Sequence, residues 1–287
     1  MRDLCSSIPE CIGFSNTKRR IYVHSPPSVP VPPDVEVKVI GKLKSHVMAG
    51  IPIGSQSGGT AVMGTLSWFA VDSAGNYYGL TDAHVVYGFS QVYYPSPLLY
   101  VQPQYLGLRL PLPSSPQLLG PVKFTTNPVQ PTMNVDLAAF SLPQKPYPLV
   151  FGKIIPLFFS VPAEGEPVTK IGARTGATTG IVLDTSATIS MYTVLNTVAE
   201  FTGPIFELHT EEGDSGAPVI LQSALVSTIV GGNGQFAVGN DPIVLQQTLS
   251  SWGLRAYFLQ NTLLYTIPGI IYTGIGVLGT ALAALLP

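Results

Sequence analysis

The stretch TEEGDSGAPVI, residues 210–220, places an acid and a hydroxyl side by side between glycines and then runs into an apolar segment. Gly213 and Gly216 allow backbone angles that other residues avoid, and they let a ligand approach the main chain. A sharp turn here would present Ser215 and aim nearby N–H groups at one point, as a serine nucleophile with an oxyanion hole requires. A plain hairpin turn is the competing interpretation, because Gly, Asp and Ser are common in all turns.

A serine nucleophile needs a base, and histidine is the usual one. All the histidines precede Ser215, which excludes the α/β-hydrolase order, where the histidine comes after the serine. His84 lies in LTDAHVV, just past a predicted strand, where a loop could present it. Asp136 lies in NVDLAAF, whose apolar residues should bury it, and a buried carboxylate needs a strong donor such as an imidazole N–H. The four histidines are His24, His46, His84 and His209.

The composition predicts an all-β protein. The 287 residues include 29 glycines and 27 prolines, which separate short apolar runs rich in valine and threonine. The segment 241–259 is the best helix candidate, with Asp241 as N-cap, Pro242 at its first position and Gly253 at its end. Strands are expected in 34–45, on both sides of a turn at 73–76, and in 134–142, 167–189 and 217–234.

The chain divides into an arm, a folded unit and a tail. The proline-rich run 25–33 should be extended and semi-rigid, and the proline-dense region 95–131 is interpreted as long surface loops. The predicted parts are a polar, irregular arm with its linker (1–33), a compact domain (34–260) with halves at 34–145 and 146–260, and an uncharged hydrophobic tail (261–287).

The tail has two interpretations that remain open. Arg255 is the last charged residue, and the apolar stretch that follows is longer than the roughly 20 residues that span a bilayer. It has no basic flank and contains Pro268, so burial against the protein or a partner subunit competes with membrane insertion. Charged residues interrupt the N-terminus, so we expect no cleavable signal peptide; a leaderless or virion-associated location stays open.

Charge and cysteine usage exclude several classes of function. The net charge is −2 and only 10% of residues are charged, so we expect no nucleic-acid partner. Cys5 and Cys11 have no recognised metal-binding spacing; a small disulfide loop and free thiols are both open. We expect no metal and no cofactor.

Several motifs resemble those of chymotrypsin-fold serine peptidases, nearest to bacterial and viral members of the streptogrisin and α-lytic type. TDAHVV is similar to the T-x-A-H segment around the base, NVDLAAF to N-x-D-I/L-A around the acid, and GDSGAPV to G-D-S-G-G-P around the nucleophile. VTKIGARTGATTG and VGGNG resemble two further segments of the bacterial enzymes. The order His84, Asp136, Ser215 is that of the chymotrypsin-type triad.

The resemblance implies a double six-stranded β-barrel with a C-terminal helix and the triad between the barrels. It makes His84 the general base and acid, Asp136 its orienting carboxylate and Ser215 the nucleophile, with the N–H groups of Gly213 and Ser215 as oxyanion hole. It also implies an ion pair between Lys170 and Asp214, which would hold the nucleophile loop. Asp82, which precedes the histidine by two residues, is interpreted as a turn residue.

Substrate-binding residues are implied by position in the same family. His209 would lie at the base of the specificity pocket and favour an acidic or amide side chain, whereas Glu212, with Glu211 beside it, would favour a basic one. Gly231 and Gly232 would pair with the substrate backbone as an added strand. Val230 replaces the serine that normally supports the acid.

The sequence is consistent with three functions. The first is a serine endopeptidase that cleaves peptides or proteins through an acyl-enzyme. The second is a protease-fold structural or self-processing protein, associated with a capsid or membrane, with little turnover. A non-catalytic peptide-binding domain is the weakest, because binding alone does not call for all three triad residues.

Overall fold

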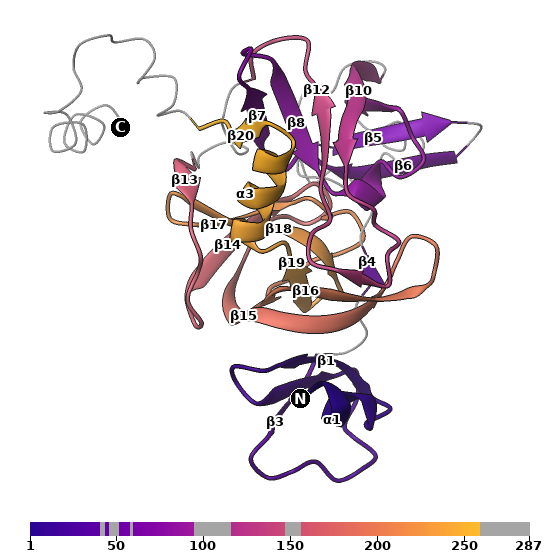
Figure 1. Ribbon diagram of the computed structural model, residues 1–287, viewed down its shortest axis with the longest axis vertical. Helices are drawn as coiled ribbons and strands as arrows, with labels where there is room; N and C mark the ends of the chain where they lie inside the picture. The colour runs from indigo at the N-terminus through magenta and orange to yellow at the C-terminus, as the bar shows by residue number, and fades with distance from the viewer. Residues whose placement is uncertain (41–43, 46–51, 58–59, 95–115, 147–155, 259–287) are drawn as a thin grey trace, which may run out of the picture.

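The computed structural model describes residues 1–40, 44–45, 52–57, 60–94, 116–146 and 156–258. Two mostly antiparallel sheets contain most of the described residues and lie one above the other in Figure 1. A small N-terminal unit lies below them. The all-β fold class predicted from the glycine and proline pattern is confirmed.

The lower sheet contains a closed six-stranded barrel. Its order is β16-β19-β18-β17-β14-β15, and a further pairing between β15 and β16 closes the ring. Phe206, Ile229 and Val238 have no exposed surface and fill its interior. The strands are β14 (Pro167–Gly172), β15 (Gly176–Tyr192), β16 (Val198–Glu207), β17 (Pro218–Leu221), β18 (Ala224–Gly232) and β19 (Phe236–Gly239).

The upper sheet has eight strands in the order β20-β7-β8-β12-β10-β9-β5-β6 and forms the other half of the double barrel. The turn predicted at 73–76 joins β7 to β8. The strands are β5 (Pro52–Ser57), β6 (Thr60–Thr65), β7 (Phe69–Asp72), β8 (Tyr77–Thr81), β9 (Gln91–Tyr94), β10 (Gln117–Thr125), β12 (Ala138–Ser141) and β20 (Leu254–Ala256).

The predicted C-terminal helix is present as α3 (Pro242–Ser251) and links the two sheets. The Asp241 side chain accepts hydrogen bonds from the N–H groups of Ile243 (2.7 Å) and Val244 (3.1 Å), which satisfies donors that the first helical turn leaves unpaired. Gly253 follows with a positive φ of 71° and ends the helix. The short elements are β4 (Lys44–Ser45), η1 (Ala83–Val85), β11 (Thr132–Met133) and β13 (Phe158–Phe159).

The prediction of long loops over 95–131 is wrong for the part that the structure describes, because β10 runs through it. Pro121 argues against a strand at the sequence level, because proline has no N–H to donate and is rare inside strands. Here it lies between two register shifts of β10, at 118–120 and 122–124, where a residue without an N–H is tolerated. The rest of that region, 95–115, lies outside the described residues.

The N-terminal residues are folded, which corrects the expectation of an irregular arm. Cys5 and Cys11 form a disulfide, and buried Ile8, Phe14 and Ile21 belong to one apolar cluster. These few apolar side chains and the disulfide are enough to order this short segment, although most of its residues are polar. The elements are α1 (Arg2–Ser6), β1 (Cys11–Ser15), β2 (Arg20–Val23) and β3 (Glu36–Val39).

This N-terminal module, residues 1–40, extends the lower sheet. β1 pairs with β15, β2 pairs with β1, and β3 runs parallel to β2. The strand expected in 34–45 therefore exists as β3, but it pairs within the module rather than within the first barrel. The domain boundaries after residues 33 and 260 stay predictions.

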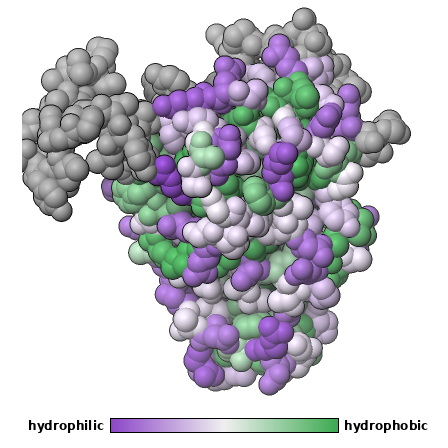
Figure 2. Space-filling model, turned by 45° about the horizontal axis from the view of Figure 1, so that its top comes forward, coloured by the Kyte–Doolittle hydropathy of each residue, from purple (hydrophilic) through white to green (hydrophobic). Residues whose placement is uncertain are grey.

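Figure 2 shows hydrophilic and hydrophobic residues interspersed over one face of the molecule. Among the described residues, no helix has both the length and the apolarity needed to cross a bilayer. The tail, 261–287, lies outside the described residues. The membrane and subunit contacts predicted for it therefore stay predictions.

Replacing Tyr22 by phenylalanine should weaken the attachment of the N-terminal module. The Tyr22 hydroxyl donates to Asp184 Oδ2 at 2.8 Å, and both residues are fully buried. Its loss leaves a buried carboxylate oxygen short of a donor, so we expect the free energy of unfolding to fall by about 1–3 kcal/mol in urea titrations. Tyr87→Phe, at a side chain that is 40% exposed, is the control; equal stability of Tyr22→Phe and the unaltered protein would contradict this.

Candidate active site

His84 lies in the short helix η1, directly after β8, so the end of an ordered strand sets its position. Only 3% of its surface is exposed, and Ala83 and Val85 on either side are completely buried. The sequence predicted a loop past a strand end, and the structure replaces that loop with a tight, packed turn. The histidine is therefore held with little freedom to move.

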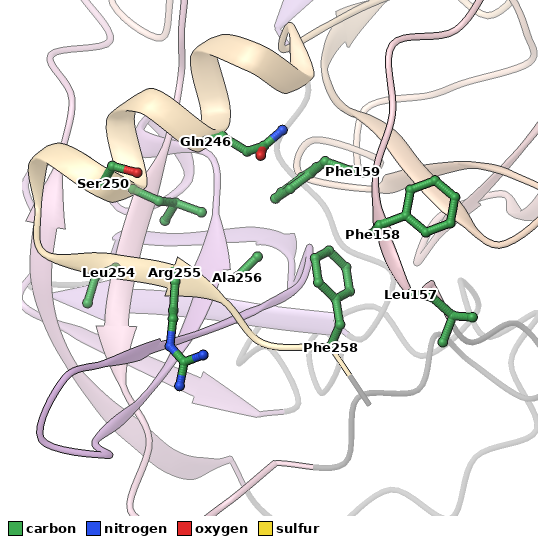
Figure 3. Close-up of a pocket in the computed structure, with 10 residues that line it drawn as sticks. Leu157, Phe158, Phe159, Gln246, Ser250, Leu254, Arg255, Ala256 and Phe258 are labelled. Carbon is green, nitrogen blue, oxygen red and sulfur yellow. The ribbon is translucent and has the colours of Figure 1, made fainter. Parts of the chain in front are cut away.

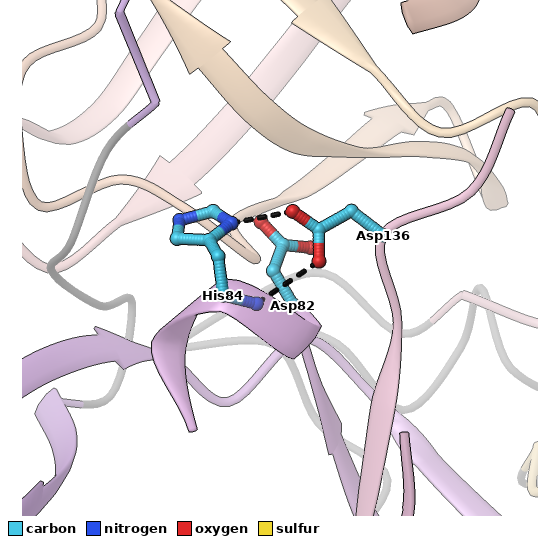
Figure 4. A group of neighbouring side chains, drawn as sticks. All are labelled: Asp82, His84 and Asp136. Atoms are coloured by element: carbon cyan, nitrogen blue, oxygen red, sulfur yellow. Dashed lines mark hydrogen bonds and ion pairs between the residues drawn. The ribbon is translucent and has the colours of Figure 1, made fainter. Parts of the chain in front are cut away.

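Asp136 lies just before β12 and hydrogen-bonds to His84 at two points (Figure 4). Its Oδ2 is 2.5 Å from His84 Nδ1, and its Oδ1 accepts the backbone N–H of His84 at 3.1 Å. Asp136 is 2% exposed. An ionised carboxylate only accepts hydrogen bonds, so Nδ1 carries the imidazole proton and Nε2 keeps its lone pair. That is the tautomer a general base needs.

Asn240 is a supporting residue that the sequence argument missed. Its side chain accepts the N–H of Asp136 at 2.8 Å and donates to the carbonyl oxygen of Asp136 at 2.9 Å. The same amide donates to Thr228 Oγ1 at 2.8 Å, and Asn240 is fully buried. The amide thus fixes the backbone that carries the carboxylate, whereas Val230 offers no side-chain donor. A polar residue between a buried strand and a helix N-cap was the available signal.

Asp82 is not the turn residue that was expected. It has no exposed surface and makes no side-chain cap to η1. Its Oδ1 lies 3.4 Å from Asn240 Nδ2, and within the described part of the chain its Oδ2 has no hydrogen-bond partner. Burial, and then the neighbouring charge of Asp136, raise the pKa of Asp82 well above its usual value. A second negative charge beside Asp136 is therefore disfavoured in the folded protein.

The side chains of Asp82, His84 and Asp136 are also the one group in the described chain whose spacing could suit a metal ion. One potential ligand atom from each lies within 4.8 Å of the others. Nδ1 of His84 already faces the Asp136 carboxylate as an N–H, so it has no lone pair to offer a cation. The group fits proton transfer better than metal binding.

Ser215 lies in a turn whose backbone requires glycine. Gly213 and Gly216 have φ values of 130° and 84°, in the region that other residues rarely adopt. A Cβ on Gly216 would lie 2.6 Å from the carbonyl oxygen of Thr65 and 3.1 Å from Thr81 Oγ1. The turn is therefore pressed against the upper sheet at the end of β8, next to the segment that carries His84.

Hydrogen bonds join this turn to both sheets. The carbonyl oxygen of Ser215 accepts from the N–H of Thr65 at 2.8 Å, and the Ser67 hydroxyl donates to the carbonyl oxygen of Gly216. On the other side, Ser215 Oγ lies 3.5 Å from the carbonyl oxygen of Val230 in β18. Ser215 itself has no exposed surface. The structure thus brings His84 and Asp136 into contact and packs the Ser215 turn beside them.

Lys170 and Asp214 lie together behind the turn. Lys170 Nζ is 2.5 Å from Asp214 Oδ2, and neither residue is exposed. Burial opposes ionisation of Asp214, but the charge of Lys170 and its hydrogen bond outweigh it and lower the pKa of Asp214. Burial likewise lowers the pKa of Lys170, against the attraction of Asp214. Thr175 also donates to Asp214, at 2.7 Å.

The residues expected to bind substrate lie around the same turn. His209 Nδ1 donates to the carbonyl oxygen of Gly234 at 2.5 Å, which ties the predicted pocket base to the loop after β18. Glu211 is engaged by Arg174 Nε at 3.0 Å, so one of the two acids considered for a basic pocket is already paired. Glu212 is exposed. Val230, Gly231 and Gly232 are buried at the end of β18.

A hollow elsewhere in the described part of the chain contains none of these residues. It has a volume of about 360 Å³ and lies between α3, β13 and β20 (Figure 3). Phe159 and Phe258 stack edge-on in it, with ring centroids 5.5 Å apart. Arg255, the last charged residue, also lines it. Its apolar wall continues the cluster under α3, so it belongs to the packing of the helix.

The fold is that of chymotrypsin-type serine proteases. Thermobifida fusca protease A superposes with a TM-score of 0.52 at 19% identity, over 75% of this chain and 100% of that one. Nocardiopsis protease gives 0.51 at 18% identity, over 74% and 99%. The α-lytic protease homologue N4 gives 0.50 at 20% identity, over 73% and 98%. The sequence matches no protein-family model and no curated protein.

Replacing Lys170 by methionine should destabilise the protein strongly at neutral pH. It leaves Asp214 buried without its cation, for which about 3–5 kcal/mol of unfolding free energy is expected. Because the pKa of Asp214 is lowered, the ion pair contributes fully above the unfolded-state pKa of about 3.9 and loses its contribution as the pH falls through the folded pKa. The deficit measured by urea unfolding should therefore shrink in acid. Lys123→Met, at an exposed position, should change little; a deficit as small as that of this control would contradict the role.

Replacing Asp82 by asparagine should stabilise the protein increasingly as the pH rises. The folded protein binds the Asp82 proton more tightly than the unfolded chain, which releases it near pH 3.9. Wild-type stability is therefore lost as the pH rises from that value to the folded pKa, at about 1.4 kcal/mol per unit. Asparagine removes that dependence. Urea unfolding at pH 4, 5.5 and 7 measures the growing difference, with exposed Asp34→Asn as control. A difference that does not vary with pH would show that Asp82 ionises normally.

Proposed function

We propose that the protein is a serine endopeptidase that acts through an acyl-enzyme on Ser215. The observation that supports this best is the buried contact of 2.5 Å between His84 Nδ1 and Asp136 Oδ2, made beside a glycine-rich turn that contains a serine. A buried imidazole–carboxylate pair alone can be structural. Its position against the Ser215 turn, in a fold shared with serine proteases, favours catalysis.

The reaction follows from the proton positions. His84 Nε2 takes the proton of Ser215 Oγ as the oxygen attacks the carbonyl carbon of the substrate, and Asp136 stabilises the imidazolium that forms. The C–N bond then breaks, and His84 gives its proton to the departing amine. Water, deprotonated in turn by His84, hydrolyses the ester and releases Ser215. Asn240 holds the backbone of Asp136 in place throughout.

The N–H groups of Gly213 and Ser215 are proposed to stabilise the oxyanion. Gly213 has a positive φ, which rotates the peptide group on its N-terminal side. Rotations of this kind are how backbone N–H groups come to face one point in anion-binding turns. The Lys170–Asp214 pair supports this geometry, because Asp214 also accepts from the backbone N–H groups of Glu211 (3.2 Å) and Arg174 (3.2 Å). These bonds hold the loop around the nucleophile.

The substrate is proposed to be a peptide or protein that pairs with Gly231 and Gly232 in place of β4, which occupies that edge of β18 in this structure. His209 is proposed to line the specificity pocket, with Glu212 at its rim. Arg174 pairs with Glu211, so Glu211 is less able to attract a basic substrate side chain than the sequence predicted. The second function, a self-processing protein with little turnover, is favoured by one observation, the complete burial of Ser215.

Substitution of Ser215 by alanine should abolish covalent labelling by a fluorophosphonate probe and reduce peptidase kcat/KM by at least ~10⁴-fold, because the attacking oxygen is removed. Labelling is read by intact-protein mass spectrometry, and circular dichroism checks the fold. Ser223→Ala, at an exposed turn position, is the matched control and should label normally. Equal labelling of Ser215→Ala and the unaltered protein would contradict the proposal.

A further inference from the structure

The hairpin of β15 and β16 ends in an uncharged, partly apolar tip. Residues 191–199, from the end of β15 to the start of β16, include no charged residue. Within this run Tyr192 is 42% exposed and Val198 is 59% exposed. Single exposed apolar side chains are normal on a protein surface, whereas apolar side chains that gather at one place mark contact sites. The tip is therefore a candidate contact surface.

Tyr192 and Val198 form a cross-strand pair on one face of the hairpin. They lie directly opposite each other in the pairing of β15 with β16, which brings their side chains together. The next pair, Met191 and Ala199, is buried in the same apolar cluster as Val230. Successive side chains of a strand point to opposite faces. The hairpin thus packs one face on the barrel and presents Tyr192 and Val198 on the other.

β4 shows how an extended segment lies relative to this pair. Lys44 is paired antiparallel with Gly232 of β18 and, on its other edge, parallel with Tyr192 of β15. β4 therefore runs between the two strands, beside the hairpin in Figure 1. Since β19 takes the opposite edge of Gly231 and Gly232, the edge next to β15 is the one on which the substrate is proposed to pair.

The same edge of β18 leads to the nucleophile. The N–H of Gly216 bonds to the carbonyl oxygen of Ile229 at 2.7 Å, and Ser215 Oγ lies 3.5 Å from the carbonyl oxygen of Val230. A substrate that runs antiparallel to β18, as β4 does, and presents its scissile carbonyl beside Val230 has its preceding residues farther along this edge. The third residue before the scissile bond then lies opposite Gly232.

We propose that Tyr192 and Val198 are specificity-determining residues that select an apolar side chain at the third residue on the N-terminal side of the scissile bond. The inference rests on the proposed peptidase function and names the class of substrate that the site takes. Residues directly opposite each other in a sheet share a face, so the side chain of this substrate residue lies next to that of Tyr192. Gly232, on its other side, has no side chain to contribute.

The hydrophobic effect gives this contact its selectivity. An apolar substrate side chain would cover surface of Tyr192 and Val198 that is exposed to water, which is favourable. A charged side chain at this place would lose hydration without gaining a partner, because residues 191–199 carry no charge. The hairpin therefore favours leucine or valine over serine or aspartate at this position.

Backbone pairing alone cannot make this choice. Pairing with the edge of Gly231 and Gly232 is open to any extended segment, and β4 already uses it. In strand addition the main chain supplies affinity, whereas contacts with alternate side chains supply specificity. Tyr192 is the residue of β15 that pairs across this edge, so it is placed to read a side chain of the segment that replaces β4.

The test compares kcat/KM of the full chain on peptides that differ at one position. One peptide that the protein cleaves, taken from a digest of denatured casein, is remade with leucine, valine, serine or aspartate at the third residue before the cleaved bond. We expect kcat/KM for leucine to exceed that for serine about 10-fold. The difference should lie mainly in KM, because the contact is made equally in the ground state and the transition state.

Tyr192→Ser and Val198→Ser should each reduce this leucine-to-serine ratio to about 3-fold or less, because half of the apolar pair is lost. Fluorophosphonate labelling of Ser215 should keep its rate in both variants, since the small probe does not extend to the hairpin. Val161→Ser is the matched control, because this valine lies after β13 and is 50% exposed. It should keep the full ratio.

The outcomes separate the inference from the proposed function. Peptide cleavage with equal kcat/KM for leucine and serine overturns the inference and leaves the peptidase standing. A ratio that stays at 10-fold in Tyr192→Ser and Val198→Ser also overturns it, even if these variants lose stability, because the pair then serves only the packing of the chain. If no peptide is cleaved, the proposed function fails and the inference with it.

Discussion

The buried pair of His84 and Asp136 is the constraint on which the rest of the site depends. A carboxylate with almost no exposed surface is costly unless every lone pair finds a donor, and here both oxygens bond to the same histidine, one to its ring and one to its backbone. Asn240 fixes the main chain of Asp136, and burial, together with the charge of Asp136, raises the pKa of Asp82. The imidazole thereby keeps one tautomer and one orientation.

The same constraint explains why two sheets are needed. His84 and Asp136 lie next to strands of the upper sheet, whereas Asn240 and Ser215 belong to the lower one. The Ser215 turn is pressed so closely against the upper sheet, at Thr65, that Gly216 has no room for a side chain. The Ser215 turn and the segment that carries His84 therefore lie next to each other only if both halves fold and dock.

The contact between His84 and Asp136 could be expected from the sequence, because each residue lies in a short motif that can be read without coordinates. The order of His84, Asp136 and Ser215 needed no coordinates. Asn240 and the true environment of Asp82 could not be found in this way, because both depend on contacts across more than a hundred residues. The N-terminal module was missed for a related reason: its few apolar side chains are dispersed, and its disulfide and its pairing with β15 order them.

The N-terminal module and the short strand after it are joined to the lower barrel. β1 pairs with β15, and β4 pairs with both β15 and β18, the strand that carries Val230. The central claim remains the proton on His84 Nδ1. A ¹⁵N–¹H correlation spectrum of histidine-labelled Ser215→Ala protein at neutral pH tests it most directly. The account predicts a strongly downfield Nδ1–H signal for His84 that is lost in Asp136→Leu, with an unprotonated Nε2; a proton on Nε2 instead would contradict it.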